Sequence, residues 1–225
     1  GTRHYHAAVY TPSTVLMNPA ALCRGLGETM PENVEVYEES PVRRVDTRSP
    51  VQVECAEGTI SAANVLLTTN AFITKLDFLR REVFPMIACA SLSRPLTEEE
   101  QHVMPGTADW GITGVATLRR TLSNRILTRH GNYYTYDFRL TNKMRRQLLA
   151  THLKGLRKLY PMLNNLDFEY TWGGVFCMTR NWTSFFGRLE RGVFASLGYC
   201  GVGVPRGTIS GKLLAEFALS SDSDL

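Results

Sequence analysis

Glycines recur at short intervals near the C-terminal end of the chain, in the stretch LGYCGVGVPRGTISGKLLAEF from Leu197 to Phe217. Such spacing is typical of loops whose backbone N–H groups bind phosphate. A dinucleotide-binding turn requires G-x-G-x-x-G, but Arg206 stands at the third glycine position. A P-loop requires four residues between its first glycine and Gly-Lys-Ser/Thr, whereas three residues separate Gly207 from Gly211. The spacing therefore fits neither phosphate-binding motif.

Binding of a negative charge is chemistry that this stretch can still perform. Gly198, Gly201 and Gly203 leave main-chain N–H groups exposed before a helix whose first turn contains Pro205. The positive end of the helix dipole there favours an anion or a carbonyl oxygen. The alternative is a tight strand-to-helix connection whose glycines only permit close packing, and both interpretations stay open. The helix is expected to present an apolar face and a small-residue face: Ile209, Leu213 and Phe217, and Gly207, Gly211 and Ala215.

Hydrophobic patterning and turn residues predict strands and helices in alternation before this stretch. Helices are expected over 18–30, where Asn18 caps and Pro19 opens the helix, over 97–104, and from 141 to a stop at Pro161. Strands are expected at 34–39, 42–47, 51–56 and 59–72 in a small antiparallel unit, and then at 83–92, 166–176 and 192–199. A strand meander over 113–138 is expected to turn at 123–124 and at 130–132. This order predicts an α/β protein of mixed α+β character.

Composition limits the function classes further. The chain has 225 residues, with 25 basic and 21 acidic side chains that form no single basic stripe, which disfavours a nucleic-acid partner. The five cysteines are odd in number and widely spaced, which favours a reducing, cytoplasmic location over a disulfide framework or a zinc site. No apolar run is long enough to predict a membrane span, and no metal site is expected.

The residues from Tyr170 to Phe217, YTWGGVFCMTRNWTSFFGRLERGVFASLGYCGVGVPRGTISGKLLAEF, resemble the C-terminal end of the FAD-dependent amine and amino-acid oxidases. This is the family of D-amino-acid oxidase, glycine oxidase and sarcosine oxidase, and the resemblance is closest to its γ-glutamylputrescine oxidase branch. The segments VEVYEESPVRRV, VLLTTNAF and LRRTLSNRILTRHG are also similar to parts of the family. The resemblance therefore extends over nearly the whole chain.

The resemblance implies a domain organisation: the C-terminal portion of a FAD-binding fold, with a substrate domain built on a mixed, largely antiparallel sheet. Residues 1–30 would lead into the substrate domain, 31–76 would be a remnant of the FAD-binding domain, 77–172 the substrate-binding domain, and 173–225 the C-terminal FAD-binding strand, turn and helix. The family's opening G-x-G-x-x-G unit does not occur in this sequence. We therefore expect a truncated chain that holds FAD weakly or not at all and is inactive alone.

The resemblance also implies site residues. The cofactor would contact the backbone of the strand that contains Val42, the end of the strand that precedes Thr69, a glycine after Trp172 and the glycine-rich turn. The residues are Val42, Thr69, Gly173, Gly201, Val202, Gly203, Val204 and Pro205. The substrate would meet Tyr134, Phe176 and Arg180. In the family the turn lies at the flavin ring and stabilises negative charge on it. Cys200 stands where the family commonly has Ser, and Val202 stands where it commonly has His. The absence of that imidazole puts a proton-transfer or hydrogen-bonding role of residue 202 in doubt.

The resemblance implies oxidation of a C–N bond, with hydride transfer to the flavin and oxygen as acceptor; no catalytic side chain is assigned, because the flavin carries the chemistry. Phe176 stands where amino-acid oxidases have an arginine for the substrate α-carboxylate, which favours a small-molecule amine or γ-glutamyl-amine. Cys177 is interpreted as a core residue. A flavin dehydrogenase and a binding domain that has lost the cofactor remain alternatives, and the oligomeric state stays open.

Overall fold

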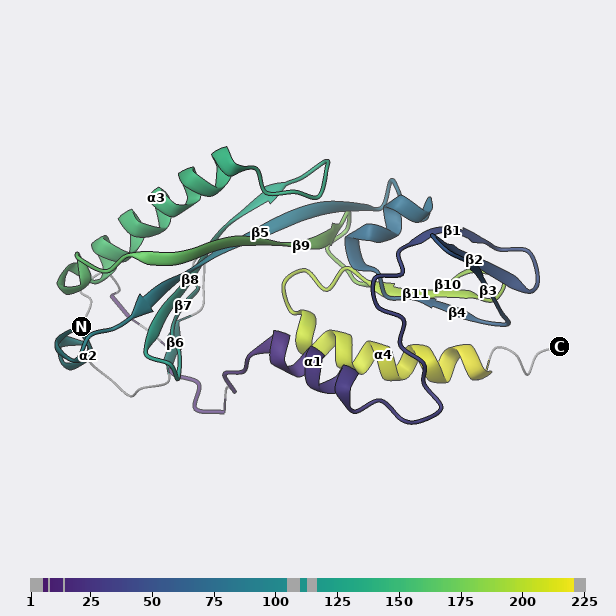
Figure 1. Cartoon of the computed structure of the whole chain (residues 1–225), viewed down its shortest axis with the longest axis horizontal. Coiled ribbons are helices and arrows are strands. Elements are labelled where there is room, and N and C mark those ends of the chain that lie inside the picture. Colours follow the sequence, from purple (N-terminus) through teal and green to yellow (C-terminus); the bar gives the residue numbers. More distant parts are fainter. Residues whose placement is uncertain (1–5, 8, 14, 105–109, 113–116, 221–225) are drawn as a thin grey trace. The chain divides into compact units, whose positions relative to one another are not determined.

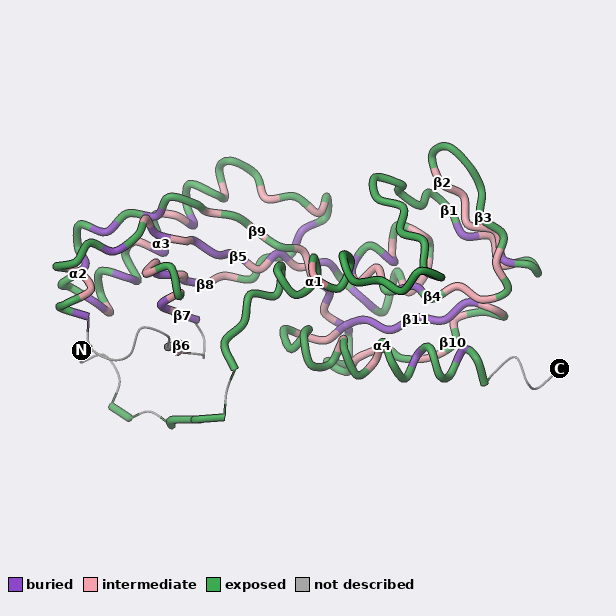
Figure 2. Tube along the Cα trace, turned by 60° about the horizontal axis from the view of Figure 1, so that its bottom comes forward, coloured by how far each residue is buried: buried purple, intermediate pink, exposed green. Residues whose placement is uncertain are grey.

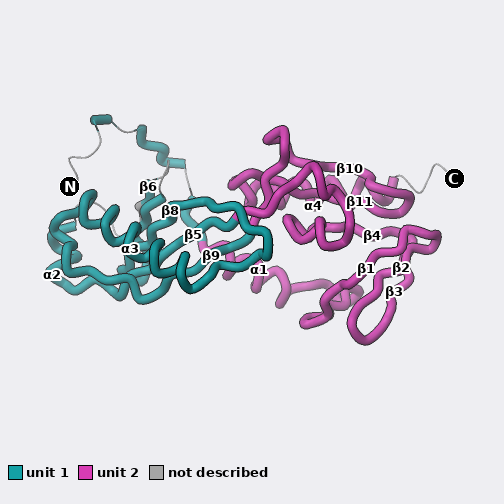
Figure 3. Tube along the Cα trace, turned by 90° about the horizontal axis from the view of Figure 1, so that it is seen from above, with its two compact units in different colours: residues 1–17, 87–175 teal, residues 18–86, 176–225 magenta. Residues whose placement is uncertain are grey.

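The computed structural model describes residues 6, 7, 9–13, 15–104, 110–112 and 117–220. It divides the chain into two compact units, each made of two segments (Figure 3). The first unit comprises residues 1–17 and 87–175, and the second comprises 18–86 and 176–225. In the described part of the chain, no helix is long and apolar enough to cross a membrane.

The first unit is built on a sheet with the strand order β6-β7-β8-β5-β9. The strands are β5 (Val83–Pro95), β6 (Trp110–Ile112), β7 (Thr117–Arg120), β8 (Arg125–Tyr134) and β9 (Phe168–Thr179); the unit boundaries fall within β5 and β9. The helices are α2 (Glu98–Val103), α3 (Asn142–Leu159) and the short 3-10 turn η2 (Pro161–Leu163). The long helix α3 runs along one face of this sheet (Figure 1). The pairs β6–β7 and β7–β8 are antiparallel.

Local sequence signals position the helices of the first unit. Thr97 and Glu100 form a capping box at the start of α2, and the Thr141 side chain accepts the Met144 N–H at the start of α3. The helix predicted from residue 141 to Pro161 is confirmed as α3. Its buried stripe consists of Leu148, His152 and Leu156, in which His152 is the polar member. Leu156 packs in a core with Leu118 and Ile126.

The second unit contains two sheets. One has the order β1-β2-β3, with β1 (Val42–Asp46), β2 (Val51–Cys55) and β3 (Thr59–Ala62) antiparallel. The other has the order β10-β11-β4, with β4 (Val65–Leu67), β10 (Phe185–Glu190) and β11 (Val193–Leu197). Strand β4 runs parallel to β11, with Ala195 opposite Leu67. Residues 65–67 are thus a strand as predicted, but they belong to a different sheet from the antiparallel unit in which the sequence placed them.

The second unit also contains α1 (Pro19–Glu28), the 3-10 helix η1 (Asn70–Leu76) and α4 (Gly203–Ser220). The predicted cap of α1 is confirmed, because Asn18 Oδ1 accepts the N–H groups of Ala20 and Ala21 at 3.1 Å. Strand β11 is buried throughout, whereas α1 is mostly exposed (Figure 2). The described residues thus form a mixed α/β fold, and the predicted fold class is confirmed.

Two predicted features of the fold are wrong. Residues 34–39 form no strand, since Glu39 turns the backbone at a φ of 53° and Tyr37 bonds locally to Glu35. The predicted turn at 130–132 is absent, because β8 continues through Gly131, which accepts its φ of 93° within the strand. The turn at 123–124 is confirmed by Asn124, with φ 55°. Residues 113–116 of the predicted meander lie outside the described residues.

Candidate functional site

The turn between β11 and α4 has an uncommon backbone conformation. Gly198, Cys200 and Gly201 have φ values of 79°, 50° and 90°, and the Val202 N–H donates to Tyr199 O at 3.0 Å to close the turn. A non-glycine residue with positive φ costs roughly 1–2 kcal/mol. Such strain persists where the surrounding structure imposes it, and it is concentrated at functional sites. Cys200 is one of eight described non-glycine residues with a positive φ, so the strain alone does not single out this turn; the open glycine backbone makes it a candidate site.

Contacts with the end of β9 hold the turn in place. A Cβ atom at Gly198 would lie 2.5 Å from Thr179 Cγ2, so only glycine fits this close approach. The Cys200 thiol donates to Gly198 O at 3.2 Å and lies 4.0 Å from Thr179 Oγ1. Burial raises the pKa of the Cys177 thiol to about 11, although a hydrogen bond from the Gly198 N–H lowers it in part. Cys177 is a buried residue beneath the turn, in agreement with its interpretation as a core residue.

Helix α4 begins directly after this turn. Gly203 is its first residue, and the first N–H groups of a helix have no partner within the helix. No atom lies within 4 Å of a Cβ position at Gly201 or Gly203, so a ligand could approach the backbone there. Arg206 adds a positive charge in the first turn and, with Pro205 and three other residues, lines an open depression of about 320 Å³. The turn and the helix start together can bind a negatively polarised group.

The parallel pairing of β4 with β11 brings Thr69 to the same edge of the sheet as this turn. Both strands end at that edge, so the residues that follow them lie beside one another, and ligands of α/β sheets bind outside the carboxyl ends of parallel strands. The Thr69 Oγ1 atom is buried and has no hydrogen-bond partner among the described residues. The adjacent Asn70 side chain accepts the Cys177 N–H at 3.0 Å. Thr69 and the glycine-rich turn therefore form one site.

The remaining predicted site residues are more dispersed. Val42 is 39% exposed on β1, and Arg180 is exposed, with its N–H donating to Glu82 O at 2.8 Å. Phe176 is half-buried on β9, and Tyr134 is exposed at the end of β8. Gly173 has a packing role, because a Cβ atom there would lie 2.6 Å from Ile87 Cγ2. The cofactor and substrate roles of these residues stay predictions.

A buried polar network in the first unit was missed from the sequence. His152 on α3 lies 2.7 Å from Ser91 Oγ through Nδ1 and 2.8 Å from His130 O through Nε2, and Ser91 Oγ lies 2.8 Å from Thr171 Oγ1. A carbonyl oxygen can only accept, so Nε2 carries the proton and Nδ1 accepts from Ser91. Ser91 and His152 are both buried, so the pair has no access for a hydrolytic substrate. A histidine within an apolar helical stripe was the only signal for it.

Comparison with known proteins agrees with this geometry. The family described as "FAD dependent oxidoreductase" (DAO) matches residues 1–217. The chain belongs to this family of FAD-dependent oxidoreductases. It is 26% identical over 238 residues to the probable oxidoreductase OrdL of Haemophilus influenzae, covering 100% of this chain and 52% of the relative. It is 27% identical over 188 residues to the gamma-glutamylputrescine oxidoreductase of Escherichia coli, covering 80% of this chain and 42% of the relative.

Among solved structures, the glycine oxidase of Geobacillus kaustophilus is similar, with a TM-score of 0.66, 19% identity, and coverage of 82% of this chain and 49% of the other. The Amadoriase I of Aspergillus fumigatus is also similar, with a TM-score of 0.64, 11% identity, and coverage of 80% of this chain and 45% of the other. These likenesses concern the fold. The chain spans about half the length of the relatives it matches.

The second unit contains groups that fit a flavin. The ring of FAD presents carbonyl oxygens that become more negative on reduction, and the open N–H groups at the start of α4 suit such atoms. The unsatisfied Thr69 Oγ1 lies at the same sheet edge and could hydrogen-bond to the ring. Thr69 and the segment from Gly201 to Val204 could therefore hold the cofactor, and their cofactor roles stay predictions.

Proposed function

We propose that this chain is part of an FAD-dependent enzyme that oxidises a C–N bond of a small-molecule amine or γ-glutamyl-amine. The single observation that carries the proposal is the turn before α4, where a left-handed Cys200 and open glycines lead into a helix start. Membership of the FAD-dependent oxidoreductase family supports it. The name of one relative, gamma-glutamylputrescine oxidoreductase, supports this substrate class.

The residues of the chain would contribute binding and electrostatics. When bound, FAD supplies the acceptor for the hydride, and we propose oxygen as the final acceptor. The N–H groups at Gly203 and Val204, together with the dipole of α4, stabilise negative charge that develops at this edge of the sheet. Thr69 donates or accepts a hydrogen bond beside them. Phe176 cannot pair with a carboxylate, which favours an amine over a simple α-amino acid.

Two further properties belong to the proposal. The sequence has no G-x-G-x-x-G turn for a pyrophosphate, so we propose that this chain alone holds FAD weakly and has little activity. Its five cysteines are free thiols, which supports a cytoplasmic location.

The proposal is tested with the full-length protein loaded with FAD. Anaerobic mixing with a panel of primary amines, γ-glutamyl amines and α-amino acids is expected to bleach the visible flavin absorbance with the first two classes only. Admission of air is then expected to restore the absorbance and to produce hydrogen peroxide. Bleaching without peroxide would assign a dehydrogenase, and no bleaching by any C–N substrate would reject the proposal.

A further inference from the structure

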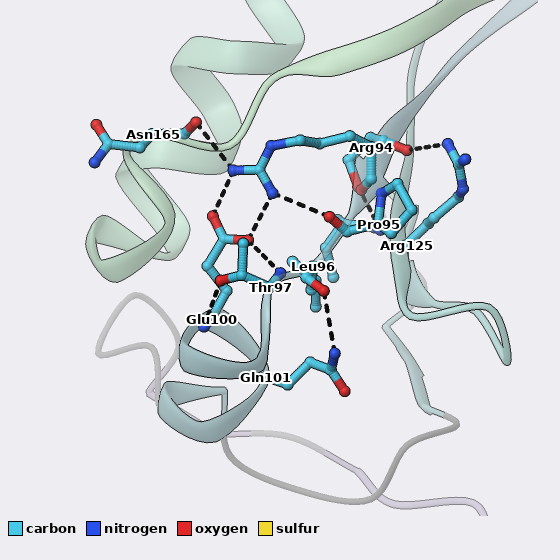
Figure 4. A network of polar contacts seen from close by, with 10 residues as sticks. Arg94, Pro95, Leu96, Thr97, Glu100, Gln101, Arg125 and Asn165 are labelled. Carbon is cyan, nitrogen blue, oxygen red and sulfur yellow. Dashed lines mark hydrogen bonds and ion pairs between the residues drawn. The ribbon is translucent and has the colours of Figure 1, made fainter.

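The sheet of the first unit contains arginines, and several of them are fully engaged. Arg94 donates from both terminal nitrogens to the Glu100 carboxylate at 2.7 Å, within the capped start of α2 (Figure 4). Arg125 pairs with Glu169. Arg120 donates from Nη2 to two side-chain amide oxygens, although its Nε is buried without an acceptor in the described residues.

Arg119 and Arg129 differ, because neither has a carboxylate partner among the described residues. Strands β7 and β8 pair with Arg119 opposite Leu127 and with Thr117 opposite Arg129. Residues two apart on paired antiparallel strands share a face and lie diagonally, about 7–8 Å apart. The two arginines therefore project from the same face of the sheet. Their neighbours in sequence, Leu118 and Thr128, belong to the opposite face.

The contacts of both side chains leave hydrogen-bonding capacity unused. Arg119 Nε is buried without an acceptor in the described residues. Among the described residues, Arg129 Nε and Nη2 reach only Thr117 Oγ1, each at 3.4 Å. Gly111 stands opposite Arg119, and a Cβ atom there would lie 3.2 Å from Arg119 Cγ, so the glycine makes room for this side chain. Arg119 Nε is closed off from a ligand, so an anion would bind the terminal nitrogens of Arg119 and Arg129, which have no carboxylate partner in the described part of the chain.

We propose that Arg119 and Arg129 form a binding site for a carboxylate group of the substrate. The guanidinium fork matches the geometry of a carboxylate, and two forks on one face can bind its two oxygens together. This inference rests on the proposed function and deepens it: the carboxylate is the one carried by a γ-glutamyl amine.

The experiment measures binding of glutarate, a small dicarboxylate, to the chain by isothermal titration calorimetry, with the neutral diamide as the comparison ligand. We expect the unmodified chain to bind glutarate but not the diamide. Arg119→Gln and Arg129→Gln should each weaken glutarate binding about tenfold or more, because each removes charge-assisted hydrogen bonds. Arg119→Lys and Arg129→Lys keep the charge but lose the fork, and they should give intermediate affinities.

Arg139→Gln is the matched control, since Arg139 is an exposed arginine of the same unit outside the sheet, and it should bind glutarate like the unmodified chain. Absence of glutarate binding, or equal affinity in all variants, would overturn the inference. If the Gln variants fail to fold, weaker glutarate binding by the Lys variants supports the inference and unchanged binding contradicts it.

In the full-length protein, the Gln variants should lower the ratio of kcat/KM for a γ-glutamyl amine to that for an alkylamine. Amine oxidation without glutarate binding would reject this inference alone, whereas glutarate binding without any amine oxidation would reject the proposed function alone.

Discussion

At the scale of single residues, the contacts and backbone angles of Gly198, Cys200 and His152 explain their roles. Gly198 combines a φ of 79° with a separation of 2.5 Å between its Cβ position and Thr179 Cγ2, so both backbone and space require glycine. Cys200 accepts strain in the same turn. Burial favours the neutral form of His152 and lowers its pKa, and its two nitrogens lie beside Ser91 Oγ and His130 O inside the first unit.

His152 predicts a pH dependence of stability. Burial lowers the pKa of His152 below its usual value of about 6.5, while the hydrogen bond to His130 O opposes the shift in part. As the pH falls below about 6.5, the unfolded chain binds a proton that the folded chain does not, so the free energy of unfolding should decrease. Urea unfolding measures this decrease over the range from about pH 8 to about pH 5, which lies on both sides of the usual histidine pKa. His152→Gln should flatten the dependence, whereas the exposed His102→Gln should retain it; a flat profile in the unmodified chain would contradict the prediction.

At the scale of elements, α4 is the predicted helix, but its apolar face is not the face that packs. The sequence grouped Ile209, Leu213 and Phe217 as the apolar face, and they are 61%, 47% and 38% exposed. The buried residues are Leu214 and Ala218, which pack against Phe194 of β11. Phe217 contributes at the edge, with its ring 5.7 Å from that of Phe194. The face that packs was decided by the position of β11.

This arrangement predicts unequal effects of truncation along α4. Leu214→Ala removes a fully buried side chain and should lower the free energy of unfolding by about 2–5 kcal/mol. Ile209→Ser changes an exposed position and should alter it by about 0.5 kcal/mol or less. Denaturant titrations of the two variants compare these values. Equal destabilisation would show that the Ile209 face is buried in solution.

At the scale of the whole molecule, the proposed site would account for one end of the cofactor. The turn before α4 and Thr69 suit the flavin ring, whereas the sequence contains no G-x-G-x-x-G turn for the pyrophosphate. The chain also spans about half the length of its relatives. A comparison of FAD affinity between this chain and the full-length protein would therefore measure how much of the binding comes from these 225 residues.

We expect this chain to bind FAD on the order of 100-fold more weakly than the full-length protein, because at least two charge-assisted hydrogen bonds to phosphate would be missing. Quenching of flavin fluorescence during titration measures both affinities. Gly201→Val should weaken the residual binding of the chain further, since φ at this position is 90°. Gly58→Ala, at a glycine with open space around it, is the control. Equal affinity of the two proteins would contradict the expectation.

The sequence by itself determined the features that depend on neighbouring residues. The Asn18 cap, the capped helix at Thr97, the helix from residue 141 and the turn at 123–124 were predicted from local signals and are present in the structure. Pro205 lies in the first turn of α4, as predicted. The family resemblance also came from contiguous stretches of sequence, and the family match bears it out. Local backbone preferences and short-range hydrogen bonds act within a few residues, so they can be predicted directly from the amino-acid sequence.

Only the tertiary structure decided which distant segments meet. The parallel pairing of β4 with β11 placed Thr69 beside the glycine-rich turn, the register of β7 and β8 put Arg119 and Arg129 on one face, and α3 brought His152 to Ser91. Residues 34–39 had strand-like patterning but no partner strand. Strand pairing and the choice of a buried helix face depend on long-range packing, which overrides local propensity and leaves no mark at a fixed sequence spacing.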